Sequence, residues 1–282
     1  MYSPKDYWSS LADGYGSMDT SGFAPILHPL APSWFNRSID DLQFRALRRA
    51  LALASIKPGA KVLDVGCGTG RWVRRYGELG FSALGMDATI GMLQIARTRG
   101  TKAPLTTGLA QNLPFADASF DCVSDITVVQ HIPHELQAKA LQEMVRVLRP
   151  KGRMILMEVI CRKGPRAERD SHVFPREPRD WISSVENCGV SLMEWFGQEF
   201  LLADRFYVRL AQTLFGRKSS LVKQVQSTYP RSSSHESSVA HRVYWKLRHI
   251  TIPFSIWIEP TLERICPASL ATHGIFIFRK ES

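Results

Sequence analysis

The chain has 282 residues, of which 44% are hydrophobic and 22% charged, a composition typical of a globular domain with a buried core. It contains no run of about 20 apolar residues, the length that a membrane-spanning helix needs. The polar N-terminus, with Lys5, Asp6 and Asp13, is unlike a secretory signal peptide. Five scattered cysteines without a Cys-x-x-Cys pair predict reduced thiols, no disulfide framework and no metal site, so we expect a cytoplasmic protein.

The net charge is +10, and the excess of cations is uneven. Residues 1–161 carry 18 Lys/Arg against 14 Asp/Glu, whereas residues 162–250 carry 15 against 9. A basic segment of this kind can bind nucleic acid, anionic lipid or an anionic substrate, or it can be a solvated positive surface. Both interpretations stay open at this stage.

The elements follow a regular order along the chain. An N-terminal segment, residues 1–45, is rich in aromatic and turn-forming residues, and a helix is predicted from about Asp40 to Pro58. Strands are predicted at Lys61–Val65, Phe81–Met86, Pro104–Thr107, Phe120–Ile126, Met154–Ile160, Val190–Trp195 and Gly274–Phe278. Helices are predicted from Thr69 and at Ile90–Arg99, His134–Leu148, Asp180–Cys188, Phe206–Phe215 and Ser238–His249.

This alternation predicts an α/β fold, with a Rossmann-like, mostly parallel seven-stranded sheet covered by helices on both faces. We divide the chain into four parts. They are an N-terminal cap at 1–45, a cofactor-binding core at 46–195, a mainly helical lid or insertion at 196–272 and the final core strand at 273–282.

A glycine-rich turn follows the first strand. Asp64 precedes glycines at 66, 68 and 70, which permit positive φ angles and a close approach of a ligand to the backbone. A dinucleotide fold would need its third glycine at position 71, where this chain has Arg71. An acid beside the turn would also repel a phosphate, whereas it suits a cofactor that carries an ammonium and a sulfonium group.

This Asp-x-Gly-x-Gly-x-Gly run resembles the first motif of class I S-adenosylmethionine (SAM)-dependent methyltransferases, in particular the methyltransferase type 11-like small-molecule group. The resemblance covers about residues 55–160. It implies SAM as cofactor, with S-adenosylhomocysteine as product, and a carboxylate at the end of the second strand that accepts hydrogen bonds from the ribose. The cofactor-binding residues that it implies are Asp64, Gly66, Gly68, Gly70, Asp87, Ala88, Met92, Ala110, Gln111 and Thr127.

Two positions qualify this resemblance. Asp87 has a second interpretation as a helix N-cap, and the two roles are compatible. Leu109 stands where relatives often have an acid that meets the adenine amino group. We expect Gln111 or backbone groups around Ala110 to replace that contact.

His131 is the candidate catalytic base. It follows the fourth strand in a segment that, in the resembling family, passes close to the methyl group, and imidazole titrates near neutral pH. The alternative is a structural hydrogen bond beside the cofactor. No Asn/Asp-Pro-Pro-Tyr/Phe sequence follows the fourth strand, which argues against amino-methylation of a nucleobase.

The acceptor pocket is expected between the N-terminal segment and the insertion. Its candidate residues are Tyr7, Tyr15, His28, Trp34 and Phe35. An enclosed pocket favours methyl transfer to an O, N or C nucleophile of a small-molecule metabolite over a nucleic-acid partner. The alternatives are an RNA or protein methyltransferase that uses the basic segment 162–250, and a SAM-fold protein without methyl transfer.

Overall fold

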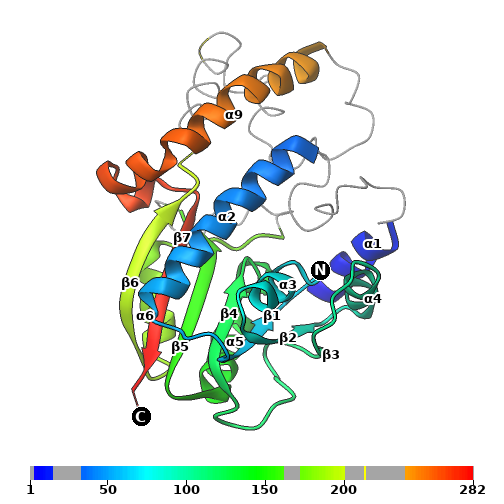
Figure 1. The fold of residues 1–282 in the computed structure, drawn as a ribbon, viewed down its shortest axis with the longest axis vertical. Coiled ribbons are helices and arrows are strands. Elements are labelled where there is room, and N and C mark those ends of the chain that lie inside the picture. The colour runs from blue at the N-terminus through cyan, green and yellow to red at the C-terminus, as the bar shows by residue number, and fades with distance from the viewer. Residues whose placement is uncertain (1–2, 15–32, 162–171, 201–212, 214–238, 282) are drawn as a thin grey trace.

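A seven-stranded sheet runs through the molecule in the order β3-β2-β1-β4-β5-β7-β6 (Figure 1). The computed structural model describes residues 3–14, 33–161, 172–200, 213 and 239–281. The strands are β1 Lys61–Val65, β2 Ser82–Asp87, β3 Leu105–Thr107, β4 Phe120–Ile126, β5 Leu148–Val159, β6 Val190–Gln198 and β7 His273–Lys280. Strands β1 to β5 pair in parallel, and β7 runs antiparallel to both β5 and β6. The predicted fold class is confirmed.

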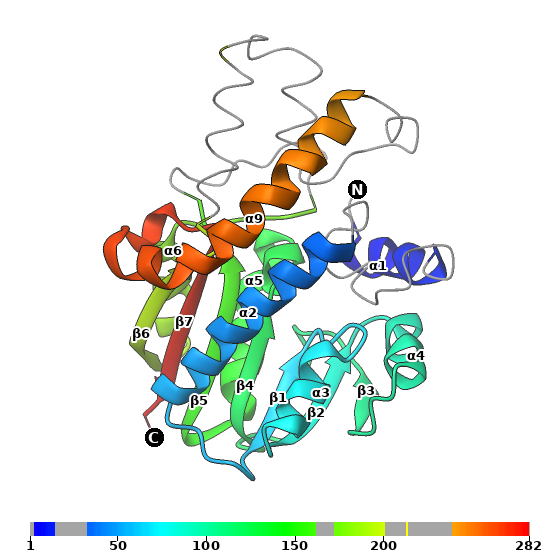
Figure 2. The same ribbon diagram turned by 45° about the horizontal axis from the view of Figure 1, so that its top comes forward.

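Helices cover both faces of this sheet (Figures 1 and 2). They are α1 Pro4–Asp13, α2 Ser33–Leu53, α3 Arg71–Glu78, α4 Ile90–Thr98, α5 His134–Val147, α6 Pro178–Glu186 and α9 Val239–Ile265. None of the helices in the described ranges is both long and apolar enough to cross a membrane.

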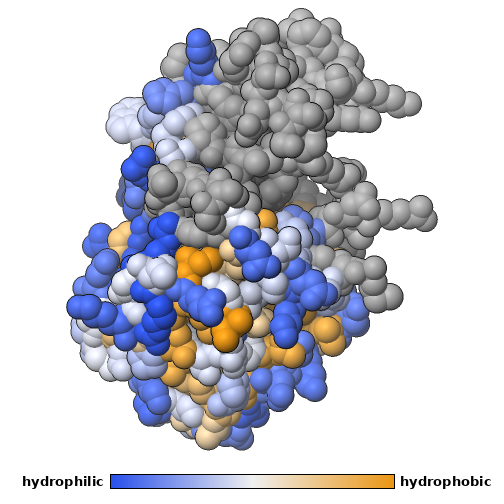
Figure 3. Space-filling view, turned by 90° about the vertical axis from the view of Figure 1, so that its right-hand side faces the viewer, coloured by the Kyte–Doolittle hydropathy of each residue, from blue (hydrophilic) through white to orange (hydrophobic). Residues whose placement is uncertain are grey.

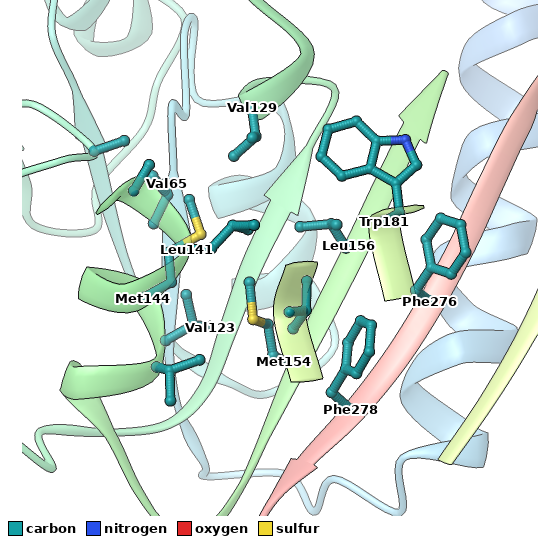
Figure 4. Close-up of a cluster of buried hydrophobic side chains, with 14 of the residues drawn as sticks. Val65, Val123, Val129, Leu141, Met144, Met154, Leu156, Trp181, Phe276 and Phe278 are labelled. Atoms are coloured by element: carbon teal, nitrogen blue, oxygen red, sulfur yellow. The ribbon is translucent and has the colours of Figure 1, made fainter. Parts of the chain in front are cut away.

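Alternation along the strands divides the core into two layers. Val123 and Leu156 point toward α5 and α6, whereas Cys122 and Ile155 belong to the cluster under α2 and α3. Figure 4 shows the first layer, in which side chains of α5 and the ring of Trp181 from α6 pack over the sheet. Each fully buried apolar side chain of this kind stabilises the fold by about 1.5–3 kcal/mol.

Most predicted elements lie within two residues of the observed ones, and the exceptions have physical causes. Helix α2 begins at Ser33, before the predicted Asp40, because Phe35 and Ile39 already bury their side chains against α9. Helix α9 continues past His249 to Ile265, through two prolines that lie on its exposed side. The helix predicted at 206–215 lies outside the described residues, apart from Thr213.

The N-terminal segment contains a helix that its composition did not predict. Ser3 is the N-cap of α1 and its side chain accepts a hydrogen bond from the Asp6 amide, while Pro4 occupies the first helical position. Helix α2 runs without a break through residue 45, so the boundary drawn there between cap and core falls inside a helix that packs on the sheet.

Candidate active site

The glycine turn after β1 forms one wall of the candidate site. Gly66, Gly68 and Gly70 have φ angles of +67°, +51° and +72°, a region that other residues rarely adopt. A Cβ atom at Gly66 would lie 2.5 Å from Val128 Cγ1, so the turn also approaches the loop after β4 closely. The turn is tied to β2 because the Cys67 amide donates to the Met86 carbonyl over 2.9 Å.

A cavity of about 360 Å³ opens beside this turn, at the carboxyl ends of β1, β2 and β4. Nine of the predicted site residues line it: Gly66, Gly68, Asp87, Ala88, Met92, Ala110, Gln111, Thr127 and His131. Leu109 and Leu136 border the cavity and are 44% and 38% exposed. Figure 3 shows apolar side chains gathered among hydrophilic ones on the side of the molecule that carries α4. The cavity therefore combines a few polar groups with apolar walls.

Asp87 lies at the end of β2 with its carboxylate held by the backbone. Its Oδ2 accepts a hydrogen bond from the Gly68 amide and its Oδ1 accepts one from the Thr89 amide, both over 2.8 Å. Burial raises the pKa of Asp87, and these two hydrogen bonds lower it. The N-cap of α4 is Thr89 and not Asp87. Each carboxylate oxygen retains a lone pair for a hydroxyl in the cavity.

Asp64 lies beneath the turn, outside the cavity lining. It is 1% exposed, and its Oδ1 accepts a hydrogen bond from the Ser124 hydroxyl over 3.0 Å. Its Oδ2 is buried without a hydrogen-bond partner, and burial raises the pKa of Asp64 to about 7. Gly70 also lies outside the lining, and a Cβ atom there would clash with Thr101 Oγ1. These two residues shape the turn.

Arg71 lines the cavity, although the sequence indicated it only as the residue that breaks a dinucleotide pattern. Its Nη1 donates to Asp40 Oδ1 over 2.9 Å and its Nη2 donates to Gln43 Oε1 over 3.0 Å. Asp40 is also ion-paired with Arg75, so two guanidinium groups share one carboxylate. Burial lowers the pKa of Arg71 to about 10, which leaves it cationic at neutral pH. The single negative charge of Asp40 balances only one of these two guanidinium groups, so a net positive charge remains beside the cavity.

His131 presents an uncharged imidazole to the cavity. Its Nδ1 lies 2.8 Å from the His172 carbonyl oxygen, so Nδ1 carries the proton. The Gln130 Oε1 accepts the Val159 amide hydrogen bond, and its Nε2 therefore faces His131 Nε2 at 3.3 Å. Burial lowers the pKa of His131 to about 4. The unprotonated Nε2 therefore accepts a hydrogen bond from the Gln130 side-chain amide.

Helix α1 covers the imidazole from outside. Trp8, which the sequence analysis did not select, lines the cavity, and its ring meets the His131 ring edge-on at 5.1 Å. Tyr7 stacks on His172 at 4.4 Å and its hydroxyl lies 3.2 Å from His172 Nε2. His172 in turn stacks on His131 at 5.3 Å. Tyr7 thus supports the site through a second ring and is absent from the cavity lining.

The other predicted acceptor-pocket residues lie elsewhere. Trp34 and Phe35 are on α2, where Phe35 is 1% exposed and packs with Ile252 of α9. Neither lines the cavity. Tyr15 and His28 lie outside the described residues.

A buried pair of acids holds the loop after β4. Asp125 and Glu158 are both 0% exposed, and their carboxyl groups hydrogen-bond to each other, which requires a proton on one of them. Both accept the Val128 amide, at 3.1 and 3.2 Å, and Glu158 also accepts the Gln130 amide at 3.3 Å. Burial raises the pKa of Asp125 to about 7 and that of Glu158 well above its usual range. The pair lies directly under the loop that presents His131.

The strand order of the sheet is that of the Rossmann-like methyltransferase fold. Residues 63–156 match the family model of the methyltransferase domain. The resemblance to SAM-dependent methyltransferases is thereby confirmed, with SAM as the methyl donor that this family implies.

Individual relatives match the same part of the chain. The probable tRNA methyltransferase 9B of Mus musculus is 36% identical over 138 residues, which cover 48% of this chain and 30% of that protein. The demethylmenaquinone methyltransferase of Paenarthrobacter aurescens (strain TC1) is 37% identical over 117 residues, which cover 41% of this chain and 46% of that protein. The chain thus spans less than half the length of these two curated relatives.

The crystal structure of the cyclase SpnF shares the fold. It superposes with a TM-score of 0.54 and 18% identity, and the match covers 84% of this chain and 81% of that one. A likeness at this identity concerns the fold alone.

The raised pKa of Asp125 predicts a pH-dependent stability. Between about pH 4 and 7 the folded protein binds more protons at this site than the unfolded chain, so the site makes the unfolding free energy fall as pH rises. We expect Asp125→Asn to gain about 1 kcal/mol or more relative to wild type between about pH 5 and 8, since one pKa unit is about 1.4 kcal/mol. Urea denaturation across this range measures the difference. Asp41→Asn, at an exposed acid, is the control, and parallel curves for Asp125→Asn and wild type would contradict the assignment.

Proposed function

We propose that this chain is a SAM-dependent methyltransferase that acts on an O, N or C nucleophile of a small-molecule acceptor. One observation carries the proposal: the Asp87 carboxylate, the Arg71 guanidinium and the unprotonated His131 Nε2 line the same cavity beside the glycine turn. The residues proposed to bind the cofactor, Asp87 and Arg71, thus line the same cavity as the proposed proton acceptor, His131.

The charged groups of the cavity fit the cofactor. SAM supplies an electrophilic methyl group on a sulfonium, next to an ammonium and a carboxylate. The guanidinium of Arg71, which lines the cavity, favours the carboxylate. Asp87 accepts hydrogen bonds from the ribose hydroxyls, because both of its oxygens are fixed by backbone amides. Met92 and Ala110 provide apolar contacts for the adenine ring, with Gln111 beside them.

His131 takes up the proton that the acceptor loses. Its Nε2 lone pair accepts the Gln130 side-chain amide in the free protein, so the acceptor must replace that amide before Nε2 can take the proton. The carbonyl at Nδ1 stabilises the imidazolium that proton uptake would form. Trp8 and the buried acid pair restrict the ring from two sides, through a ring contact and through the loop backbone. Methyl transfer also requires the nucleophile to be oriented in line with the methyl group and the sulfonium.

The walls of the cavity favour a small, partly apolar acceptor. Trp8, Leu109, Ile132 and Leu136 border it with apolar surface, beside the two cations Lys5 and Arg71. Similarity to demethylmenaquinone methyltransferase agrees with a ring-shaped small molecule. Similarity to a tRNA methyltransferase favours tRNA as a second candidate acceptor. Incubation with SAM and each acceptor class, read out as S-adenosylhomocysteine formed, distinguishes the two; bound SAM without turnover on any acceptor would favour the non-transferring alternative.

Removing the Asp87 carboxylate tests cofactor binding. We expect Asp87→Ala to weaken SAM by roughly tenfold to a hundredfold, because hydrogen bonds to a charged group contribute about 1.5–3 kcal/mol. Isothermal titration with SAM and with S-adenosylhomocysteine measures Kd. Asp41→Ala removes an exposed acid of α2 and should leave Kd unchanged. An unchanged Kd in Asp87→Ala would show that the cofactor does not use this wall.

Two arginines on the same aspartate provide a matched pair. Arg71 and Arg75 both bind Asp40, but only Arg71 lines the cavity. We expect Arg71→Lys to raise the Kd for SAM about tenfold, since lysine cannot keep Asp40, Gln43 and a cofactor carboxylate together. Arg75→Lys should leave Kd near the wild-type value. Thermal denaturation of both variants separates the binding effect from destabilisation, and equal Kd values for the two variants would contradict the role of Arg71.

Substitution of His131 tests the proposed base. We expect His131→Ala to lower the rate of methyl transfer by about 10²- to 10⁴-fold with little change in the Kd for SAM. Since the pKa of His131 lies at about 4, the wild-type rate should fall on acidification only near pH 4 and not near 6.5. His134→Ala, outside the cavity lining, is the control. A wild-type rate in His131→Ala would leave the imidazole with a structural role only.

A further inference from the structure

Helix α9 exposes a continuous apolar stripe that the proposed reaction does not use. Phe254, Trp257 and Ile265 are 58%, 76% and 71% exposed, and their rings and side chains share one helical face. Pro253 and Pro260 are exposed on the same face. We name these five residues the α9 stripe.

The orientation of α9 is fixed by its opposite face. Ile252 is fully buried against α2, and Glu259 accepts the Phe200 amide at 3.1 Å through Oε1. Arg49 of α2 is ion-paired with Glu263 of α9. Figures 1 and 2 show α9 alongside α2 on the outer side of the molecule. The stripe therefore faces outward because the other face of the helix is packed.

The charges around the stripe are cationic. From Val239 to Ile258 the sequence contains three Arg/Lys and two His residues and no Asp or Glu. Of the two acids that follow, Glu259 is 1% exposed and Glu263 is paired with Arg49. Lys246 and Arg264 are exposed. The helix thus combines the α9 stripe with two exposed cations, Lys246 and Arg264, neither of which forms an ion pair among the described residues.

We propose that the α9 stripe docks this protein on the surface of an anionic lipid bilayer. Trp and Phe enter the boundary between headgroups and acyl chains, while Lys and Arg bind anionic headgroups, which is the behaviour of an interfacial amphipathic helix. An RNA surface is less suited: Lys246 and Arg264 could bind its phosphates as they bind lipid headgroups, but a sugar-phosphate backbone would not bury Phe254, Trp257 and Ile265 as the acyl boundary of a bilayer does. A second copy of the chain is disfavoured by mutual repulsion at a net charge of +10.

Vesicle flotation of the full chain tests the docking independently of any methyl transfer. The probes are vesicles of phosphatidylcholine alone and vesicles of phosphatidylcholine and phosphatidylglycerol in equal parts, at about 0.15 M salt. We expect the protein to float with the anionic vesicles only, and Phe254→Ser/Trp257→Ser to lower partitioning at least about tenfold. Leu53→Ser, an exposed leucine of α2, should float like wild type.

Two charge-reversal variants, one on α9 and one elsewhere, complete the test. Arg264→Glu should lower partitioning several-fold, whereas Lys102→Glu, at an exposed lysine outside α9, should have little effect. Circular dichroism confirms that each variant is folded. The proposal is overturned if wild type floats with neither vesicle, or if the double serine variant floats as well as wild type. It is also overturned if the variant loses tRNA binding or self-association in place of vesicle binding.

Discussion

The reversal of the backbone after β1 is the constraint on which the site depends. Three alternating glycines take left-handed φ angles within five residues, and the chain thereby leaves a buried strand and enters α3 with room for a ligand against its backbone. The close approach of Gly66 to Val128 joins this turn to the loop after β4. The contact between Gly66 and Val128 therefore holds the glycine turn close to the loop that carries His131.

The loop after β4, which carries His131, depends on two buried carboxyl groups that hydrogen-bond to each other. Asp125 and Glu158 come from adjacent parallel strands, and together they accept the amides of the loop that carries His131. Thr127 in that loop has a φ angle of +61°, which is costly for a β-branched residue. A protonated acid pair beneath the loop offsets this strain with hydrogen bonds that an apolar pair would lack.

The sheet and half of the site could be predicted from local sequence, because buried parallel strands are continuous apolar runs and the turn needs glycine at stated positions. Asp87 ends β2 and His131 lies in the loop after β4, so the strand predictions placed both at the carboxyl edge of the sheet. Arg71 and Trp8 could not be recognised in the same way. The role of Arg71 depends on Asp40, 31 residues earlier on α2, and Trp8 reaches His131 only because α1 folds back over the loop. Such contacts between distant segments leave no periodic pattern in the sequence.

The charges of the proposed cofactor bear on the protonation state of Asp64. In the free protein this carboxyl is buried beside an acidic neighbourhood, and its pKa lies at about 7. Arg71 lowers that pKa through its charge, but Arg71 is also committed to Asp40. A ligand with one anionic and two cationic groups would bring net positive charge to Asp64 and Asp87 while its carboxylate meets Arg71. Positive charge brought close to the turn would lower the pKa of Asp64 and thereby favour its ionised form.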